Sequence, residues 1–81
     1  MKAKLVRRIT GKVLVEFANG TMDDIIGSSV FFNVSKEDAE KDWSSLWDAV
    51  RGGEIYKISP RTDGTYQIQA RGEFIDWIME D

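Results

Sequence analysis

The first third of the chain alternates between apolar and polar positions, as expected for β-strands that bury one face. Residues 2–9 combine β-branched and basic side chains and end at the turn-forming pair Thr10-Gly11. After this turn, apolar side chains recur at every second position, at Val13, Val15 and Phe17. The pattern therefore predicts two strands, over residues 2–9 and 12–17, joined at Thr10-Gly11.

The next turn signal is Asn19-Gly20, a dipeptide that favours the type I′ turn of a two-residue hairpin. We expect residues 21–26 to return as the partner strand. This register places Glu16 opposite Asp23, and like charges directly opposite each other are destabilising. Either the register is bulged or the two carboxylates are held together for a function, because local rules tend to fail at functional sites.

The strongest helical signal lies in the middle of the chain. Ser35 suits the N-cap, and Asp38, three residues later, completes a capping-box-like pair. Gly52-Gly53 is expected to end the helix through a left-handed residue. The predicted helix therefore spans residues 36–51. Its apolar stripe is formed by Ala39, Trp43, Leu46, Trp47 and Val50.

A second hairpin is predicted after the helix. A three-residue loop over residues 62–64, with Gly64 left-handed, pairs Ile58 with Ile68 and Tyr56 with Ala70. This register puts every apolar residue of the hairpin on one face.

Two shorter segments complete the fold prediction. Residues 30–32 form an apolar run that we expect to be extended, after a loop at residues 27–29. Residues 73–81 suit a short closing helix, with a strand as the alternative. The order is strand, strand, a short third strand, helix, strand, strand and short helix. The chain is thus predicted to be one α+β domain over residues 1–81, with a four- to five-stranded, mostly antiparallel sheet packed on one main helix.

Composition narrows the chemistry. The 81 residues contain no cysteine and no histidine. A disulfide framework and a thiolate metal site are therefore excluded, and the commonest general base and transition-metal ligand is missing. No apolar run has the length of a signal peptide or of the roughly 20-residue membrane helix. We expect a cytoplasmic protein that is not an enzyme and has no cofactor or metal.

The net charge of -3 hides an uneven distribution. Residues 1–12 carry five basic groups and no acid, whereas residues 13–50 carry eight acids and two bases. An acidic block disfavours direct binding to a phosphate backbone, which requires clustered Lys and Arg. The basic strand at the N-terminus is the opposite patch. It suits an acidic partner, an ion-paired strand or a protected sheet edge.

Catalytic sites have weak support. Glu16, Asp23 and Asp24 have the oxygen ligands that magnesium prefers, but a solvated acidic hairpin end is the interpretation that we favour. Ser28-Ser29 with Lys36 contains the residue types of a Ser/Lys nucleophile pair, although nothing in the spacing fixes that geometry.

Two features point to binding instead. An acidic surface is predicted from the helix and the first hairpin, and Phe31 is a candidate apolar anchor because it points away from its neighbour Phe32. Trp43 and Trp47 are expected mainly in the core, and any exposed indole there would be an interface anchor. The predicted partner-binding residues are Asp23, Asp24, Glu37, Glu40, Asp42, Asp48 and Phe31.

The stretch Leu14-Val15-Glu16-Phe17-Ala18-Asn19-Gly20 resembles the first hairpin of a family of small bacterial domains of unknown function. The acidic-aromatic end Phe74-Ile75-Asp76-Trp77 is also similar to that family, which carries no known catalytic residues. In size and charge alone, the chain resembles small acidic phage-encoded inhibitors, including anti-CRISPR proteins. That resemblance implies binding to host nucleases or surveillance complexes, in some cases by nucleic-acid mimicry.

These observations lead to two functional hypotheses. The first is a non-enzymatic inhibitor or regulator that docks its acidic surface on the basic, nucleic-acid-binding groove of another protein. The alternative is an accessory or antitoxin-like subunit that acts through sheet-edge or apolar contacts. Both exclude direct nucleic-acid binding and a membrane, and both allow a monomer or a homodimer.

Overall fold

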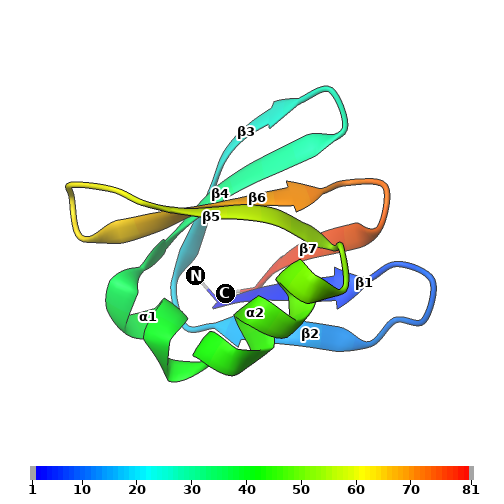
Figure 1. Cartoon of the computed structure of the whole chain (residues 1–81), viewed down its shortest axis with the longest axis horizontal. Helices are drawn as coiled ribbons and strands as arrows, with labels where there is room; N and C mark the ends of the chain where they lie inside the picture. The colour runs from blue at the N-terminus through cyan, green and yellow to red at the C-terminus, as the bar shows by residue number, and fades with distance from the viewer. Residues whose placement is uncertain (1, 81) are drawn as a thin grey trace.

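The computed structural model describes residues 2–80 as seven strands and two helices (Figure 1). The strands form two antiparallel sheets, in the orders β2-β1-β7 and β3-β4-β6-β5. The α+β class is therefore confirmed, but the single sheet on one helix is wrong. The elements are β1 (Lys2–Arg7), β2 (Val13–Phe17), β3 (Gly20–Ile26), β4 (Ser29–Ser35), α1 (Lys36–Lys41), α2 (Trp43–Arg51), β5 (Ile55–Pro60), β6 (Thr65–Arg71) and β7 (Ile75–Glu80).

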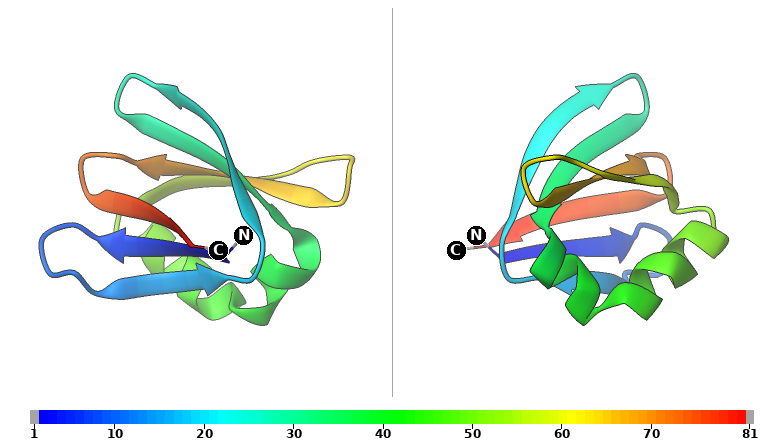
Figure 2. Two further views of the ribbon diagram at one scale, coloured as in Figure 1. Left: turned by 180° about the vertical axis from the view of Figure 1, so that it is seen from behind. Right: turned by 60° about the vertical axis from the view of Figure 1, so that its left-hand side comes forward.

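The two sheets share one core, and α2 closes one side of it by packing against β2 and β5 (Figures 1 and 2). These two strands are the outer strands of their sheets on that side. The remaining outer strands are β3 and β7. The β3–β4 ribbon extends away from β1, β2 and β7 in all three views.

The two strands predicted on either side of Thr10-Gly11 are confirmed, and they pair with each other. β1 pairs with β2 in antiparallel register, with Leu5 opposite Val15. Gly11 in the connecting turn has φ of 72°, a left-handed conformation that glycine adopts without a Cβ clash. The alternation of apolar and polar residues thus predicted these two strands correctly.

The predicted hairpin at Asn19-Gly20 is wrong. β2 and β3 do not pair, and the chain passes here from one sheet to the other. The Asn19 N–H donates to the Asp38 carboxylate at 2.9 Å, which ties this crossing to α1. Gly20 is buried, and a Cβ on it would lie 3.2 Å from the Ala3 Cβ. The glycine therefore serves a close approach between the sheets.

The expected conflict between Glu16 and Asp23 consequently disappears. Glu16 lies in the three-stranded sheet, where Lys4 approaches it at 4.0 Å, while Asp23 lies in the four-stranded sheet. β3 instead forms a hairpin with β4 around Gly27, which has φ of 61°. The extended conformation expected for residues 30–32 is confirmed as part of β4.

The helix begins and ends where predicted but is interrupted at Asp42. Ser35 accepts a hydrogen bond from the Asp38 N–H at 3.1 Å. Gly53 has φ of 87°, so the helix ends at a left-handed residue as predicted. The Gly53 N–H donates to the Val50 carbonyl. At Asp42 the backbone leaves the helical region, with φ of -130° and ψ of 42°. This break lets α1 pack on β4 and β6 while α2 packs on β2 and β5.

The second hairpin is confirmed near its turn and differs further away. Ile58 pairs with Ile68 as predicted, and Gly64 has φ of 84°. Ala70 pairs with Ile55 and not with Tyr56, because the register shifts between Ile55 and Lys57. The register change moves Tyr56 out of the core and leaves the residue 56% exposed.

The predicted short closing helix is also wrong. Residues 75–80 form β7, which pairs with β1 along its whole length, whereas residue 81 lies outside the described residues. Burial alternates at period two, from Ile75 through Trp77 to Met79. The open edge of β1 stabilises the extended form, which sequence periodicity alone did not select.

The core contains an aromatic cluster at the junction of the sheets. Phe32 is fully buried, and its ring stacks on Trp77 at a centroid distance of 3.9 Å. Phe17 lies 6.5 Å from Phe32 and 6.2 Å from Trp77. One ring comes from each of β2, β4 and β7, so this cluster joins the two sheets.

Ser35→Ala is expected to lower the free energy of unfolding by about 1 kcal/mol, because it removes the side-chain cap of α1. Ser44→Ala is the matched control, since Ser44 is exposed within α2 and alanine has the higher helix propensity. Urea unfolding of both variants checks the prediction. A Ser35→Ala variant as stable as Ser44→Ala would show that the cap contributes nothing.

Candidate functional site

The two sheet edges without a helix are the first candidate surface. β3 pairs only with β4, and β7 pairs only with β1, among the described residues. Unpaired strand edges are the sites at which other chains add to a sheet. Of the two strands, β3 is the more accessible, because residues 21–26 are all exposed.

The exposed part of β3 is apolar to an unusual degree. Met22 is 45% exposed, Ile25 58% and Ile26 62%. Met22 lies opposite Phe32 and Ile25 opposite Val30, whereas Ile26 lies opposite Ser29. The strand therefore presents apolar side chains on both faces of the sheet. Together with Asp24, these residues are called the β3 edge surface below.

Asp23 lies at a bulge, since the register shifts between Met22 and Asp24. Its carboxylate accepts hydrogen bonds from Arg61 at 2.9 Å and from Gln67 at 3.2 Å. The bond from Arg61, followed by the bond from Gln67, holds the pKa of the Asp23 carboxyl below its ordinary value. Any stability from this interaction is present above the ordinary Asp pKa and is lost as the pH falls through the lowered value.

Asp24 and Phe31 are neighbours across the β3–β4 hairpin. The Asp24 side chain accepts from the Ile25 N–H at 2.8 Å and forms no ion pair in the described part of the chain. Phe31 is half-buried and faces away from the core, whereas Phe32 is fully buried. The prediction that the two rings point to opposite faces is confirmed.

The remaining predicted residues lie on the helices and not on the β3 edge. Glu37 and Glu40 are exposed on α1, and Asp42 is half-buried at the break. Asp48 is exposed on α2 and pairs with Arg51. No hydrogen bond or ion pair between described residues joins these carboxylates to Asp23 or Asp24, so the predicted acids lie on separate elements, the helices and β3.

The same helices expose aromatic rings. Trp43 and Trp47 are each 37% exposed and meet edge to face at 5.8 Å. Trp43 also contacts Tyr66 at 5.4 Å, and the Lys36 ammonium lies 5.9 Å from the Tyr66 ring. Trp43 and Trp47 are therefore less buried than a core position requires.

The basic N-terminal strand is largely neutralised within the fold. Lys4 lies 3.1 Å from Glu80, and Arg8 pairs with Asp76 at 3.2 Å. Arg7 binds Glu54 through two guanidinium nitrogens, at 2.7 and 3.2 Å, and Glu54 is only 5% exposed. Sequence reasoning missed this buried pair, since Arg7 and Glu54 are 47 residues apart and no local pattern links them.

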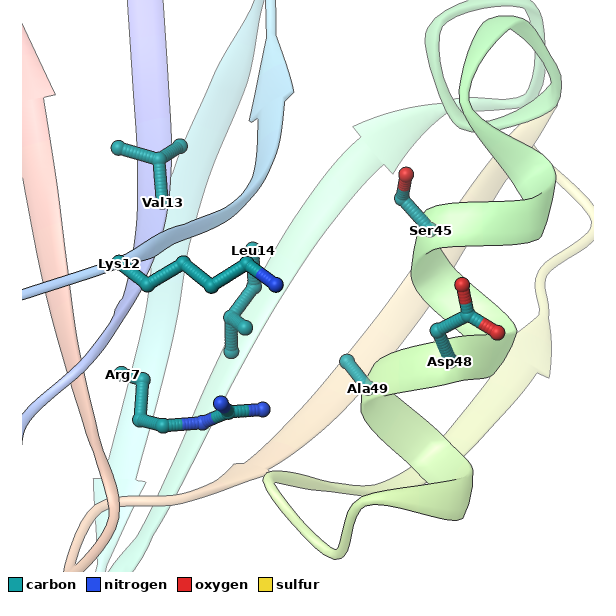
Figure 3. Close-up of a pocket in the computed structure, with 7 residues that line it drawn as sticks. All are labelled: Arg7, Lys12, Val13, Leu14, Ser45, Asp48 and Ala49. Carbon is teal, nitrogen blue, oxygen red and sulfur yellow. The ribbon is translucent and has the colours of Figure 1, made fainter. Parts of the chain in front are cut away.

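A cleft of about 240 Å³ lies between β2 and α2 beside this pair (Figure 3). Arg7 and Lys12 extend from the strand side toward Ser45 and Asp48 on the helix. Its charges are mixed, since Arg7 is already engaged by Glu54 and Asp48 by Arg51. Lys12 is then the one charged lining residue without an ion pair among the described residues, and a single lysine does not define a ligand site.

The structure does not assemble the catalytic candidates. Glu16 lies in a different sheet from Asp23 and Asp24. Ser28-Ser29 and Lys36 lie at opposite ends of β4. Within residues 2–80, no group of three or more acidic residues is arranged to hold a metal ion, and no helix is long and apolar enough to cross a membrane.

The β3 edge surface was also missed by sequence reasoning. Met22, Ile25 and Ile26 were assigned to the returning strand of a hairpin, where one face is expected to be buried. The consecutive pair Ile25-Ile26 was the available signal, because neighbouring residues of a strand point to opposite faces.

No family model, curated protein or solved structure that we compared with the chain matches it.

Proposed function

We propose that this protein is a non-enzymatic inhibitor or regulator that docks on a basic partner protein through the β3 edge surface. The supporting observation is the combination on one strand of an edge without a strand partner among the described residues, exposed apolar side chains, and an Asp24 carboxylate that forms no ion pair within residues 2–80. Apolar residues contribute binding energy at interfaces, and charges steer association and select the partner.

The proposal combines both functional hypotheses. The acidic character at Asp24 selects a basic surface, and Met22, Ile25 and Ile26 contribute apolar contacts at a sheet edge. Phe31 adds an apolar ring beside Asp24. If the partner uses its basic surface to bind nucleic acid, this protein would cover that surface and prevent the nucleic acid from binding. This is the inhibitory role that we propose.

Charge reversal tests this function. Asp24→Lys is expected to weaken capture of a basic partner about tenfold at low salt and less at high salt, because exposed charges are screened. The matched control is Glu37→Lys, which makes the same charge change on α1. Quantitative affinity capture from candidate hosts, at two salt concentrations, measures both variants. Equal capture by Asp24→Lys and the wild type at low salt would contradict the proposal.

The helix surface is the second candidate, supported by the partly exposed indoles of Trp43 and Trp47 on α2 and the exposed Glu37 and Glu40 on α1. Tryptophan is enriched among residues that dominate binding energy. If this surface carries the function, Glu37→Lys/Glu40→Lys will reduce capture while Asp24→Lys leaves it unchanged. The same capture experiment therefore distinguishes the two surfaces.

A further inference from the structure

We propose that the occupant of the β3 edge surface is an extended segment of the partner, which adds to the four-stranded sheet as a fifth strand. Its side chain opposite Asp24 is Lys or Arg, and its side chains toward the core are apolar. This inference rests on the proposed function and specifies the partner class and the mode of binding. It requires main-chain hydrogen bonds to β3, which docking by charge alone does not.

The backbone of β3 has one edge at which a further strand could form hydrogen bonds. The strand spans seven residues, from Gly20 to Ile26, and in the described chain it pairs on one side only, with β4. Main-chain groups along the free side provide affinity for an added strand, and pockets for alternate side chains provide specificity. Two of the other outer strands, β2 and β5, are less suited because α2 packs on them, and β7 has buried or half-buried residues at every second position.

The inner side of this edge offers an apolar pocket. A cavity of about 350 Å³ is lined by Asn19, Gly20, Thr21, Met22 and Met79, where β3 leaves the junction of the sheets. Ile25 continues the apolar lining along β3, because it faces the same side as Met22 across from Val30 and Phe32. An added strand would cover both side chains with its own apolar residues, spaced at period two.

The outer side of the edge selects a cation. Asp23 is already bound by Arg61, whereas Asp24 has no ion-pair partner among the described residues. A Lys or Arg directly across from Asp24 would form a cross-strand pair of opposite charge. Alternation then fixes the pattern of the segment, with cationic or polar residues outward and apolar residues inward.

A second copy of the chain is disfavoured as the occupant. Two β3 strands paired antiparallel about Asp23, their central residue, would place Asp23 of one copy opposite Asp23 of the other, and the neighbouring register would place Asp23 opposite Asp24. Like charges directly opposite each other destabilise such a pair, and edge charges are a common protection against self-association. The occupant is therefore a heterologous basic segment.

The test uses three synthetic eight-residue peptides and the full chain. One peptide alternates Lys with Val, the second alternates Glu with Val, and the third is the Lys/Val peptide N-methylated at every residue. We expect the Lys/Val peptide to bind about tenfold more tightly than the Glu/Val peptide at low salt. It should also slow amide hydrogen exchange in β3, measured residue by residue by NMR. N-methylation should abolish binding, because it removes the donors that a strand needs.

The variant Asp24→Lys is expected to reverse the preference between the Lys/Val and Glu/Val peptides while β3 stays folded. Equal binding of the methylated and unmethylated Lys/Val peptides would overturn strand addition but leave docking by charge intact. Failure of the Lys/Val peptide to bind would overturn the inference, and unchanged partner capture by Asp24→Lys would separately overturn the proposed function. Protection of β3 that grows with protein concentration, without peptide, would identify a second copy as the occupant and also overturn the inference.

Discussion

Phe32→Ala is expected to lower the free energy of unfolding by about 3–5 kcal/mol, the usual cost of removing a buried aromatic ring. Phe32 is 0% exposed, and its ring stacks on Trp77 at 3.9 Å and lies 6.5 Å from Phe17. The substitution therefore leaves a cavity where the two sheets meet. Small domains have only about 5–15 kcal/mol of stability, so a large part of it would be lost. Urea unfolding, followed by tryptophan fluorescence, measures the change.

Phe31→Ala is the matched control, one residue earlier on the same strand. Its ring is half-buried on the outer face of the four-stranded sheet, across from Asp24 and Gln69. We expect a loss of about 1 kcal/mol or less, because little packing is removed there. If Phe31 anchors a partner, its substitution will weaken binding more than it weakens folding. Equal losses of stability for the two variants would contradict the assignment of inner and outer faces.

Arg7→Met is expected to lower the free energy of unfolding by about 2–4 kcal/mol, because it leaves the Glu54 carboxylate buried without its cation. Glu54 is 5% exposed, and Arg7 binds one of its oxygens at 2.7 and 3.2 Å. The Arg7 side chain is 37% exposed, so water screens part of the interaction and the full cost of breaking a buried pair is not expected. Methionine keeps most of the length of the side chain.

Arg8→Met is the control for this pair. Arg8 and Asp76 are also far apart in the sequence and form an ion pair at 3.2 Å, but their side chains are 52% and 54% exposed. Exposed ion pairs contribute about 0–1 kcal/mol. The double variant Arg7→Met/Glu54→Met should recover part of the lost stability, since no buried charge is left unpaired. A loss for Arg7→Met no larger than that for Arg8→Met would show that burial adds nothing to the pair.

Local signals along the chain were sufficient for several elements. The Ser35 cap, the left-handed Gly64 and the helix end at Gly53 occur where the sequence places them. Each depends on hydrogen bonds and backbone angles within a few residues, which the sequence specifies directly. The pairing of Ile58 with Ile68 follows from the same turn, because loop length sets the register next to it.

Longer-range pairing was not predictable in the same way. Asn19-Gly20 has the composition of a hairpin turn, yet it forms the crossing between sheets, held by the bond from the Asn19 N–H to Asp38. Residues 75–80 suited both a helix and a strand, and the ladder with β1 selected the strand. In both cases the competing structures are close in local energy, so contacts with distant segments decide between them.

For the candidate site too, the sequence predicted some features and only the tertiary structure showed the others. The sequence alone identified Asp23, Asp24 and Phe31 as candidate contact residues and indicated that Phe31 and Phe32 face opposite ways. Only the tertiary structure showed that Arg61 binds Asp23, that Asp24 has no ion-pair partner in the described chain, and that Met22, Ile25 and Ile26 are exposed. Exposure of a strand depends on which neighbours the sheet supplies on either side. That neighbour relation is a property of the assembled sheet and not of the local sequence, because the pairing strands come from distant parts of the chain.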